Sequence, residues 1–271
     1  MSTAMKTAMN TVVFIPARYA STRYPGKPLV ELTGATGEAK SLIRRSWEAA
    51  TAVEGIDAVY VLTDDDRIRA ASEAFGAEVI MTSSEARNGT ERCAEGVAKL
   101  PEVPEIVVNL QGDAPLTPSW FVSDLVAHMK AHPEAQMATP VLLTDPVTLA
   151  NFVTDRKEGR VGGTTAVMRG DGTALYFSKE VLPYVGSLES PPQVWHHVGC
   201  YAYRPKALEA YANWPEGPLE KAEGLEQLRF LENGWPVDCV AVEGRGRVFW
   251  ELNNPVDVAR IESVLKKEGI A

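Results

Sequence analysis

The sequence predicts an α/β fold: a mostly parallel, Rossmann-like sheet covered by helices, with a smaller α+β lobe in the second half. Short apolar runs rich in β-branched residues, such as Val12 to Ile15 and Glu105 to Leu110, are typical of buried strands. In the first half these runs alternate with segments of helical spacing. The connections between them are short, which is the pattern of a parallel sheet with helices on both faces.

The first half gives its elements in a regular order. Residues 41–53 place Leu42, Ile43, Trp47 and Ala50 on one side of a helix. Asp66 is a plausible cap for the helix that follows it, and Gly76 ends that helix. We expect, in chain order, a strand at 12–15, a helix at 41–53, a strand at 58–62, a helix at 67–75, a strand at 78–81, a helix at 90–100 and a strand at 105–110.

Beyond Asp113 the order changes. The pair Asp171-Gly172 is a hairpin signal between two short strands. We expect a helix at 119–129, strands at 137–143, 164–168, 174–177 and 197–203, helices at 205–214 and 219–233, a strand at 237–242 and a helix at 255–267. Without a repeat or a low-complexity linker, residues 11–271 form one domain with a lobe at roughly 140–235. Residues 1–10 are expected to be a flexible tail.

The totals exclude several classes of protein. The chain has 271 residues and a net charge of −9, which argues against nucleic acid as a partner. Its cysteines, Cys93, Cys200 and Cys239, show neither a metal spacing nor a disulfide framework, so a cytoplasmic location is expected. No apolar run reaches the length of a membrane span, so no membrane association is expected.

The segment from Ala17 to Lys27, directly after the first strand, is basic. It contains three cations and two hydroxyl groups but no acid: Arg18, Arg23, Lys27, Ser21 and Thr22. Ligands of open α/β sheets bind beyond the strands' carboxyl ends, and Lys, Arg and backbone N–H groups hold phosphate there. The loop therefore predicts an anion site. A solvated surface loop is the alternative. Neither a Walker loop nor a Gly-x-Gly-x-x-Gly motif follows this strand.

Two further segments could carry chemistry. Asp113 follows the most apolar strand and would lie near the basic loop if the two strands are neighbours. A carboxylate beside phosphates is repulsive unless Mg²⁺ bridges them, and the alternative is an Asp-capped turn. Thr90, in Asn88-Gly89-Thr90, is a natural helix N-cap whose free N–H groups could hold an anion or a base edge. A plain cap is equally consistent with that segment.

The segment IPARYASTRYPGKPL resembles the N-terminal signature of the 3-deoxy-manno-octulosonate (Kdo) cytidylyltransferase family. The resemblance spans roughly residues 12–264 and implies a nucleotidyltransferase fold whose first loop wraps the triphosphate of CTP. It implies nucleotide contacts by Pro16, Ala17, Arg18, Ser21, Lys27, Asn88, Gly89, Thr90, Arg92 and Gln111. Asp113 and Asn253 would bind Mg²⁺. The chain departs from the family pattern at Asn88, Ala114 and Asn253, where the family has Ser, Glu and Asp. As a purely structural alternative, Asn254 would cap the last helix before Pro255.

The resemblance is weaker in the lobe at 140–235, which it makes an acceptor and dimerisation lobe. It implies that Gln111, Lys179, His197, Tyr201, Glu226 and Gln227 bind a sugar acid. Lys179 replaces the usual Arg and is a point charge, not a bidentate fork. His197 lies in an apolar run, so a satisfied core histidine is the alternative.

The function implied is transfer of CMP from CTP to the anomeric hydroxyl of a 2-keto sugar acid, expected to be Kdo, with release of pyrophosphate. Arg18 and Lys27 would stabilise charge on the phosphates, and Asp113 would hold the metal. A cytoplasmic homodimer is expected. One alternative is the same reaction on another acidic sugar, an amino-Kdo or a nonulosonate. Another is a non-catalytic CTP-binding regulator, which Asn253 and Ala114 suggest.

Overall fold

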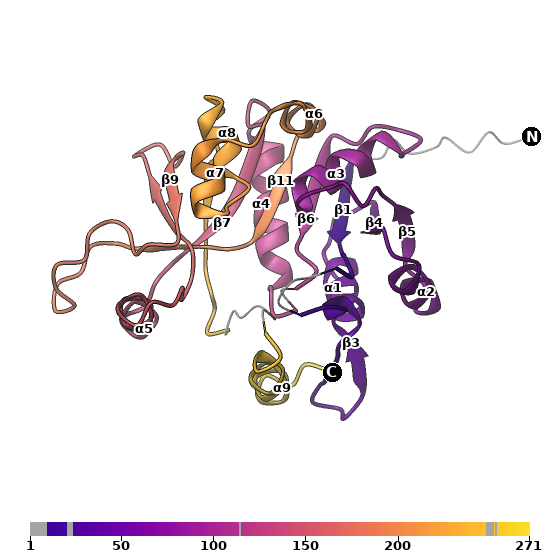
Figure 1. The fold of residues 1–271 in the computed structure, drawn as a ribbon, viewed down its shortest axis with the longest axis horizontal. Helices are drawn as coiled ribbons and strands as arrows, with labels where there is room; N and C mark the ends of the chain where they lie inside the picture. The colour runs from indigo at the N-terminus through magenta and orange to yellow at the C-terminus, as the bar shows by residue number, and fades with distance from the viewer. Residues whose placement is uncertain (1–9, 21–23, 114, 248–251, 253) are drawn as a thin grey trace, which may run out of the picture.

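The computed structural model describes residues 10–20, 24–113, 115–247, 252 and 254–271. Its main feature is a ten-stranded sheet in the order β5-β4-β1-β6-β11-β7-β10-β8-β9, with β12 paired to β7 outside this path (Figure 1). The strands β1, β4, β5, β6, β7, β8 and β12 point one way, and β9, β10 and β11 point the other. The predicted α/β class with a mostly parallel sheet is confirmed.

The strands of this sheet are β1 (Thr11–Pro16), β4 (Ala58–Thr63), β5 (Glu78–Met81), β6 (Ile106–Leu110), β7 (Met137–Leu143), β8 (Thr165–Met168), β9 (Ala174–Ser178), β10 (Trp195–His197), β11 (Cys200–Tyr203) and β12 (Asp238–Val242). A separate hairpin is formed by β2 (Glu31–Thr33) and β3 (Ala39–Ser41). The helices are the short 3₁₀ helix η1 (Lys27–Leu29), α1 (Leu42–Thr51), α2 (Asp66–Ala74), α3 (Gly89–Ala98), α4 (Ser119–Ala131), α5 (Pro146–Lys157), α6 (Pro205–Asn213), α7 (Pro218–Glu223), α8 (Leu228–Glu232) and α9 (Asp257–Lys267).

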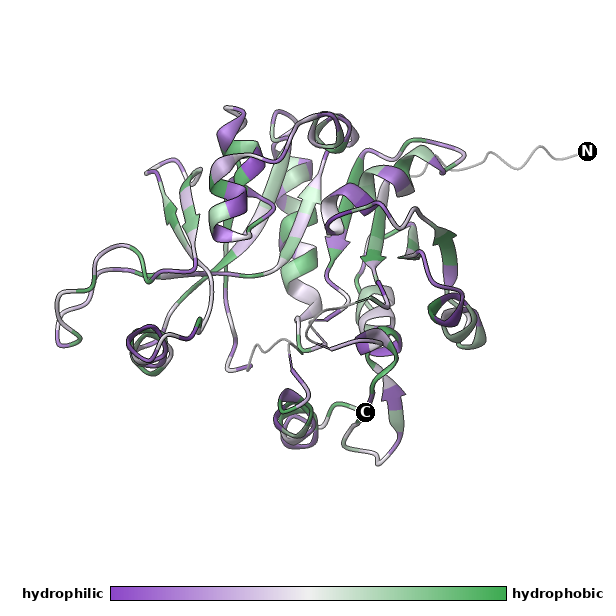
Figure 2. Ribbon diagram, in the orientation of Figure 1, coloured by the Kyte–Doolittle hydropathy of each residue, from purple (hydrophilic) through white to green (hydrophobic). Residues whose placement is uncertain are grey.

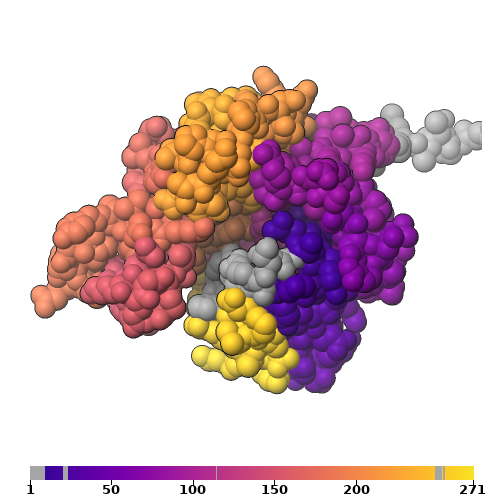
Figure 3. Space-filling view, viewed as in Figure 1, coloured from indigo at the N-terminus to yellow at the C-terminus, as the bar shows by residue number. Residues whose placement is uncertain are grey.

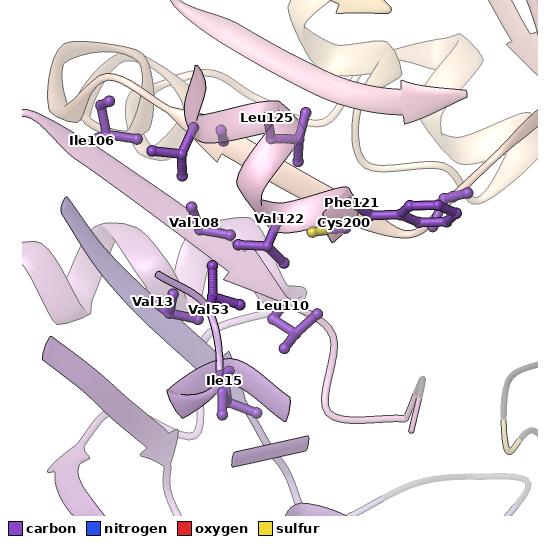
Figure 4. Packing of buried hydrophobic residues seen from close by; sticks show 14 of the residues in the cluster. Val13, Ile15, Val53, Ile106, Val108, Leu110, Phe121, Val122, Leu125 and Cys200 are labelled. Carbon is purple, nitrogen blue, oxygen red and sulfur yellow. The ribbon is translucent and has the colours of Figure 1, made fainter. Parts of the chain in front are cut away.

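The core lies on both faces of β1. This strand pairs in parallel with β4 and β6, so its side chains alternate between two helical layers. Val13 and Ile15 pack with α1 and α4 in one cluster, part of which is drawn in Figure 4. Val12 and Phe14 pack with α3 and α6 in the other. Figure 2 shows the central strands as mostly hydrophobic, whereas α2 and α9 mix hydrophobic and hydrophilic residues.

Three predicted caps are wrong. Asp65, not Asp66, caps α2 through its side chain. Asn88, not Thr90, caps α3, because its amide oxygen accepts the N–H of Glu91. Asn254 does not cap the last helix: α9 begins at Asp257, whose carboxylate accepts the N–H of Asn254 at 2.7 Å.

Two predicted elements are each divided in two. The expected strand at 197–203 is β10 and β11, because the chain changes neighbours at Val198-Gly199: β10 pairs with β7 and β8, β11 with β6 and β7. The expected helix at 219–233 is α7 and α8. Gly224, at φ +60°, ends α7 in the left-handed conformation that glycine adopts without strain. The helix α5 and the β2–β3 hairpin were not predicted.

The segment at 140–235 supplies α5 to α8 and the strands β8 to β11, which join the same sheet as the strands of the first half. Its separation as an acceptor lobe stays a prediction. The last helix, α9, packs instead on β2 and α1 in a small third cluster that contains Leu32, Leu42 and Ile261. None of the helices described is both long and apolar enough to span a bilayer.

Candidate functional site

A cavity of about 480 Å³ opens beyond the carboxyl ends of β1 and β6. Figure 3 shows orange segments from the second half of the chain and indigo to purple segments from the first half close to one another at the centre of the visible face. The lining comes from five parts of the chain: Pro16, Ala17, Arg18, Lys27 and Pro28; Ala86, Arg87, Asn88, Gly89 and Arg92; Gln111, Gly112 and Asp113; Tyr201; Glu216, Glu220, Gly224, Leu225, Glu226 and Gln227.

The basic loop forms the cationic side of this cavity. Its start is held to the sheet by the N–H of Ala17, which donates to the carbonyl of Leu62 at 2.8 Å. The Lys27 ammonium then lies 2.7 Å from a carboxylate oxygen of Asp113, and the exposed fractions of these side chains are 14% and 29%. Arg18, on the same loop, is exposed and lines the cavity. The structure thus brings together the two sequence segments that were expected to be neighbours.

The position of Asp113 is fixed by close packing of its backbone. A side chain at Gly112 would place its Cβ 3.0 Å from the carbonyl oxygen of Pro16, so any other residue would push the two strand ends apart by a few tenths of an ångström. On its other side, the carbonyl of Asp113 accepts the N–H of Leu252 at 2.8 Å. Ser21, predicted to bind nucleotide, and Asn253, predicted to bind metal, lie outside the described residues, as do Arg23 and Ala114.

The first turn of α3 forms a second side of the cavity. Gly89 sits directly over β6: a Cβ there would lie 3.1 Å from the amide nitrogens of both Asn109 and Gln111. The Thr90 hydroxyl lies 2.8 Å from the Tyr203 hydroxyl. The backbone N–H of Thr90 is not free, because it donates a hydrogen bond to the Glu226 carboxylate. Thr90 itself is buried and does not line the cavity.

Arg92 lines the same side as a nearly buried cation. Its guanidinium lies 3.3 Å from a carboxylate oxygen of Asp64 and contacts the Thr82 hydroxyl. Burial lowers its pKa from the ordinary value, an effect that Asp64 opposes. The charge of Arg92 is therefore held in place by the fold before any ligand arrives.

Glu226 joins the side of the cavity formed by residues 216–227 to the α3 turn. One of its carboxylate oxygens accepts the N–H of Thr90 at 3.0 Å and the other accepts the Gln111 amide at 3.1 Å. Burial raises the pKa of this carboxyl. Next to it, the side-chain oxygen of Gln227 accepts a hydrogen bond from the Tyr201 hydroxyl at 3.3 Å. The side-chain nitrogen of Gln227 is buried without a hydrogen-bond partner in the described part of the chain.

Two of the residues predicted to bind sugar do not line the cavity. His197 is buried in the sheet, 3.0 Å from the Thr139 hydroxyl, and burial lowers its pKa to about 3. It has the surroundings of a satisfied core histidine. The Lys179 ammonium lies behind the cavity wall, 3.0 Å from where a Cβ on Gly224 would be. Their roles toward a sugar stay predictions.

Several residues that line the cavity were not predicted from the sequence, Arg87, Glu216 and Glu220 among them. Arg87 adjoins the Asn88-Gly89-Thr90 segment, so its charge was a signal that could have found it. Glu220 had no such signal, because only the folded structure shows that it is buried against Arg229. The fully buried Arg229 forms two bonds of 2.6 Å with Glu220 and one of 3.0 Å with Glu91.

The chain is similar to known proteins along most of its length. The sequence profile of the family described as "Cytidylyltransferase" matches residues 12–238. A 3-deoxy-manno-octulosonate cytidylyltransferase from Maricaulis maris is 42% identical over 96% of this chain and 99% of the relative. An 8-amino-3,8-dideoxy-manno-octulosonate cytidylyltransferase from Shewanella baltica is 37% identical over 95% of this chain and 99% of the relative.

A solved structure is similar along almost the whole chain. It is a CMP:2-keto-3-deoxy-manno-octonic acid synthetase complexed with CTP, which superposes with a TM-score of 0.82 at 32% identity and covers 96% of this chain and 99% of the solved one. The predicted family resemblance is confirmed by both kinds of comparison. The chain belongs to the cytidylyltransferase family.

Proposed function

We propose that this enzyme transfers CMP from CTP to the anomeric hydroxyl of Kdo and releases pyrophosphate. The single observation that carries the proposal is the contact of Lys27 with Asp113 at one cavity, 2.7 Å apart although 86 residues separate them in the chain. Lys27, a cation that could bind phosphates, thereby lies beside Asp113, a carboxylate that could bind a metal ion. The two residues meet where the basic loop, the α3 turn and the 216–227 segment converge. The activities named for the relatives support the same substrates.

The chemistry assigned to the protein is positioning and charge neutralisation. Arg18 and Lys27 would bind the phosphates of CTP, and the turn at Asn88 and Gly89 would face the base. The acceptor oxygen attacks the α-phosphorus in line: a bond from that oxygen to phosphorus forms as the bond to the pyrophosphate oxygen breaks. Fixed cations and a fixed approach lower the barrier without a covalent enzyme intermediate.

We assign Mg²⁺ as the cofactor, with Asp113 and Asn253 as its protein ligands. The donor set fits: Asp113 offers carboxylate oxygens at the cavity, and Mg²⁺ is commonly bound by one or two carboxylates together with substrate phosphates and water. Among the described residues no three His, Cys, Asp or Glu side chains form a metal site by themselves. When bound, the ion would neutralise phosphate charge and acidify the attacking hydroxyl.

An amino-substituted Kdo is the second candidate acceptor. The side of the cavity opposite the cationic loop carries the carboxylates of Glu216, Glu220 and Glu226. Those of Glu220 and Glu226 are already hydrogen-bonded within the protein, which leaves Glu216 to meet a ligand ammonium. The relative from Shewanella baltica is named for such a sugar.

The test is pyrophosphate release from CTP and Mg²⁺ with Kdo, 8-amino-Kdo and a nonulosonate in parallel. We expect the fastest release with Kdo. Asp113→Ala should abolish release while leaving the melting temperature nearly unchanged, and Asp66→Ala, at an exposed carboxylate paired with Arg69, should behave as the wild type. Undiminished release by Asp113→Ala would refute the assignment. Calorimetric CTP binding without release for any acceptor would indicate the regulatory homologue instead.

We further propose a homodimer in the cytoplasm. Large apolar side chains are exposed around α5 and the extended segment beside β9, at one end of the molecule in Figure 1: Leu143, Val147, Val161, Tyr184 and Leu188. Such a surface is suited to burial against a second copy. The three cysteines are buried and free, which suits a reducing compartment. Light scattering should give a mass near twice 29.5 kDa.

A further inference from the structure

The hydroxyl of Tyr211 lies where two sides of the cavity meet. We call residues 86–92 the nucleotide wall and residues 216–227 the acceptor wall. Tyr211, on α6, is fully buried, and its hydroxyl accepts the side-chain amide of Asn88 at 2.9 Å. The same hydroxyl lies 3.2 Å from a carboxylate oxygen of Glu220 and 3.2 Å from the backbone carbonyl of Glu226. The Tyr211 hydroxyl therefore accepts a hydrogen bond from the nucleotide wall and donates one to the acceptor wall.

Both ends of the Asn88–Tyr211 contact are fixed. The Tyr211 ring stacks on Phe230 at 5.1 Å, and the Arg229 guanidinium lies 4.0 Å from the ring centroid on which it packs. Burial raises the pKa of Tyr211, so the phenol keeps the proton that it donates. Asn88 is held because its amide oxygen caps α3 at 2.9 Å, which aims its amide nitrogen at Tyr211. Because both groups are immobilised, a shift of one side of the cavity would move the other.

The identity of residue 88 decides whether this contact exists. Serine would still supply a cap oxygen for α3. It has no amide nitrogen, so the cap and the donor to Tyr211 could not both be satisfied in the present geometry. Asparagine does both with one side chain.

We propose that Tyr211 is a positioning residue that holds the nucleotide wall in register with the acceptor wall, through Asn88 on one side and the Glu226 backbone on the other. This rests on the proposed function for the assignment of CTP to the first wall and the sugar acid to the second. Other contacts also cross between the walls and would survive the loss of the hydroxyl, including the bond from the Thr90 N–H to Glu226. The fold is thus expected to persist without it.

The test compares Tyr211→Phe, Asn88→Ser and the double variant with the wild type. Tyr211→Phe keeps the ring and removes only the hydroxyl. We expect each single change to weaken CTP binding, measured by calorimetry, by about ten-fold, and the double variant to bind no more weakly than either. The KM for the acceptor should rise in Tyr211→Phe and not in Asn88→Ser. Tyr60→Phe is the control: Tyr60 lies on β4 and packs against Phe14 of β1, and its substitution should change neither the CTP affinity nor the acceptor KM.

Three results would overturn the proposal: losses that multiply in the double variant, an unchanged acceptor KM in Tyr211→Phe, or a lower melting temperature with unchanged CTP affinity. The last would mean that the hydroxyl only stabilises the fold. Failure of the proposed function would look different, because the wild type itself would then release no pyrophosphate. The calorimetric comparison of the variants could still be made in that case.

Discussion

Replacing Arg229 with Met tests how the wall of the cavity formed by residues 216–227 is held in place. Arg229 is fully buried, and its guanidinium binds Glu220 through two bonds of 2.6 Å and Glu91 through one of 3.0 Å. Burial opposes its charge, but the bonds to Glu220 and Glu91 and the proximity of Tyr211 raise its pKa above the ordinary value. Met fills a similar volume and leaves the carboxylate of Glu220, whose side chain is 4% exposed, without its cation.

The expected cost is that of breaking a buried ion pair, about 3–5 kcal/mol, because the remaining carboxylate stays desolvated. An unfolding entropy of about 2.1 cal/mol/K per residue gives roughly 570 cal/mol/K for a chain of this length. Each kcal/mol therefore lowers the melting temperature by about 2 °C. We expect Arg229→Met to melt about 5–9 °C below the wild type.

Scanning calorimetry measures this shift directly. The double change Arg229→Met with Glu220→Leu removes both charges and should recover most of the loss, since an apolar pair of similar volume costs little. Arg69→Met, at an arginine paired with Asp66 on the surface, is the matched control and should move the melting temperature by no more than 1–2 °C. Equal shifts for Arg69→Met and Arg229→Met would refute the reasoning, as would a double variant less stable than Arg229→Met.

Two other perturbations probe the sheet at His197 and the α3 turn at Gly89. His197 is neutral in the fold, with a pKa of about 3, but gains a proton near pH 6.5 when the chain is unfolded. Its contribution to the free energy of unfolding should therefore fall by about 2 kcal/mol from pH 7 to pH 5, as measured by urea titrations. His197→Gln should lose this pH dependence. Gly89→Ala should weaken CTP binding, measured by calorimetry, by about ten-fold, because the new Cβ would press on Asn109 and Gln111. Gly170→Ala is the control, since a Cβ there would have no neighbouring atom within 4 Å. A pH-independent difference for His197→Gln, or equal affinities for the two glycine variants, would contradict these expectations.

The nucleotide half of the fold was predictable because its signals are local. Apolar runs and helical spacing located β1, β4, β5 and β6, and the carboxyl ends of parallel strands meet by geometry, which placed Lys27 near Asp113. Caps were harder to predict: Asn88 and Thr90 are both good cap residues, and the choice between them depends on contacts with Tyr211 and Tyr203.

The second half was less predictable because its contacts are distant in sequence. The run through Val198 and Gly199 is continuous in hydropathy, yet the chain changes partners there, and only the tertiary arrangement of β6 and β7 decides this. Likewise, no local pattern in the sequence marks Glu220 and Arg229 as buried. Their burial follows from how α6, α7 and α8 pack together.

The most direct test of the central claim is a crystal structure with CTP and Mg²⁺. The prediction is that the triphosphate lies against Arg18 and Lys27, the cytosine at the turn of Asn88 and Gly89, and the ion on Asp113, whose carboxylate exchanges Lys27 for the metal. A nucleotide bound elsewhere, or one bound in this cavity with the 2.7 Å contact between Lys27 and Asp113 intact and no metal on Asp113, would contradict it.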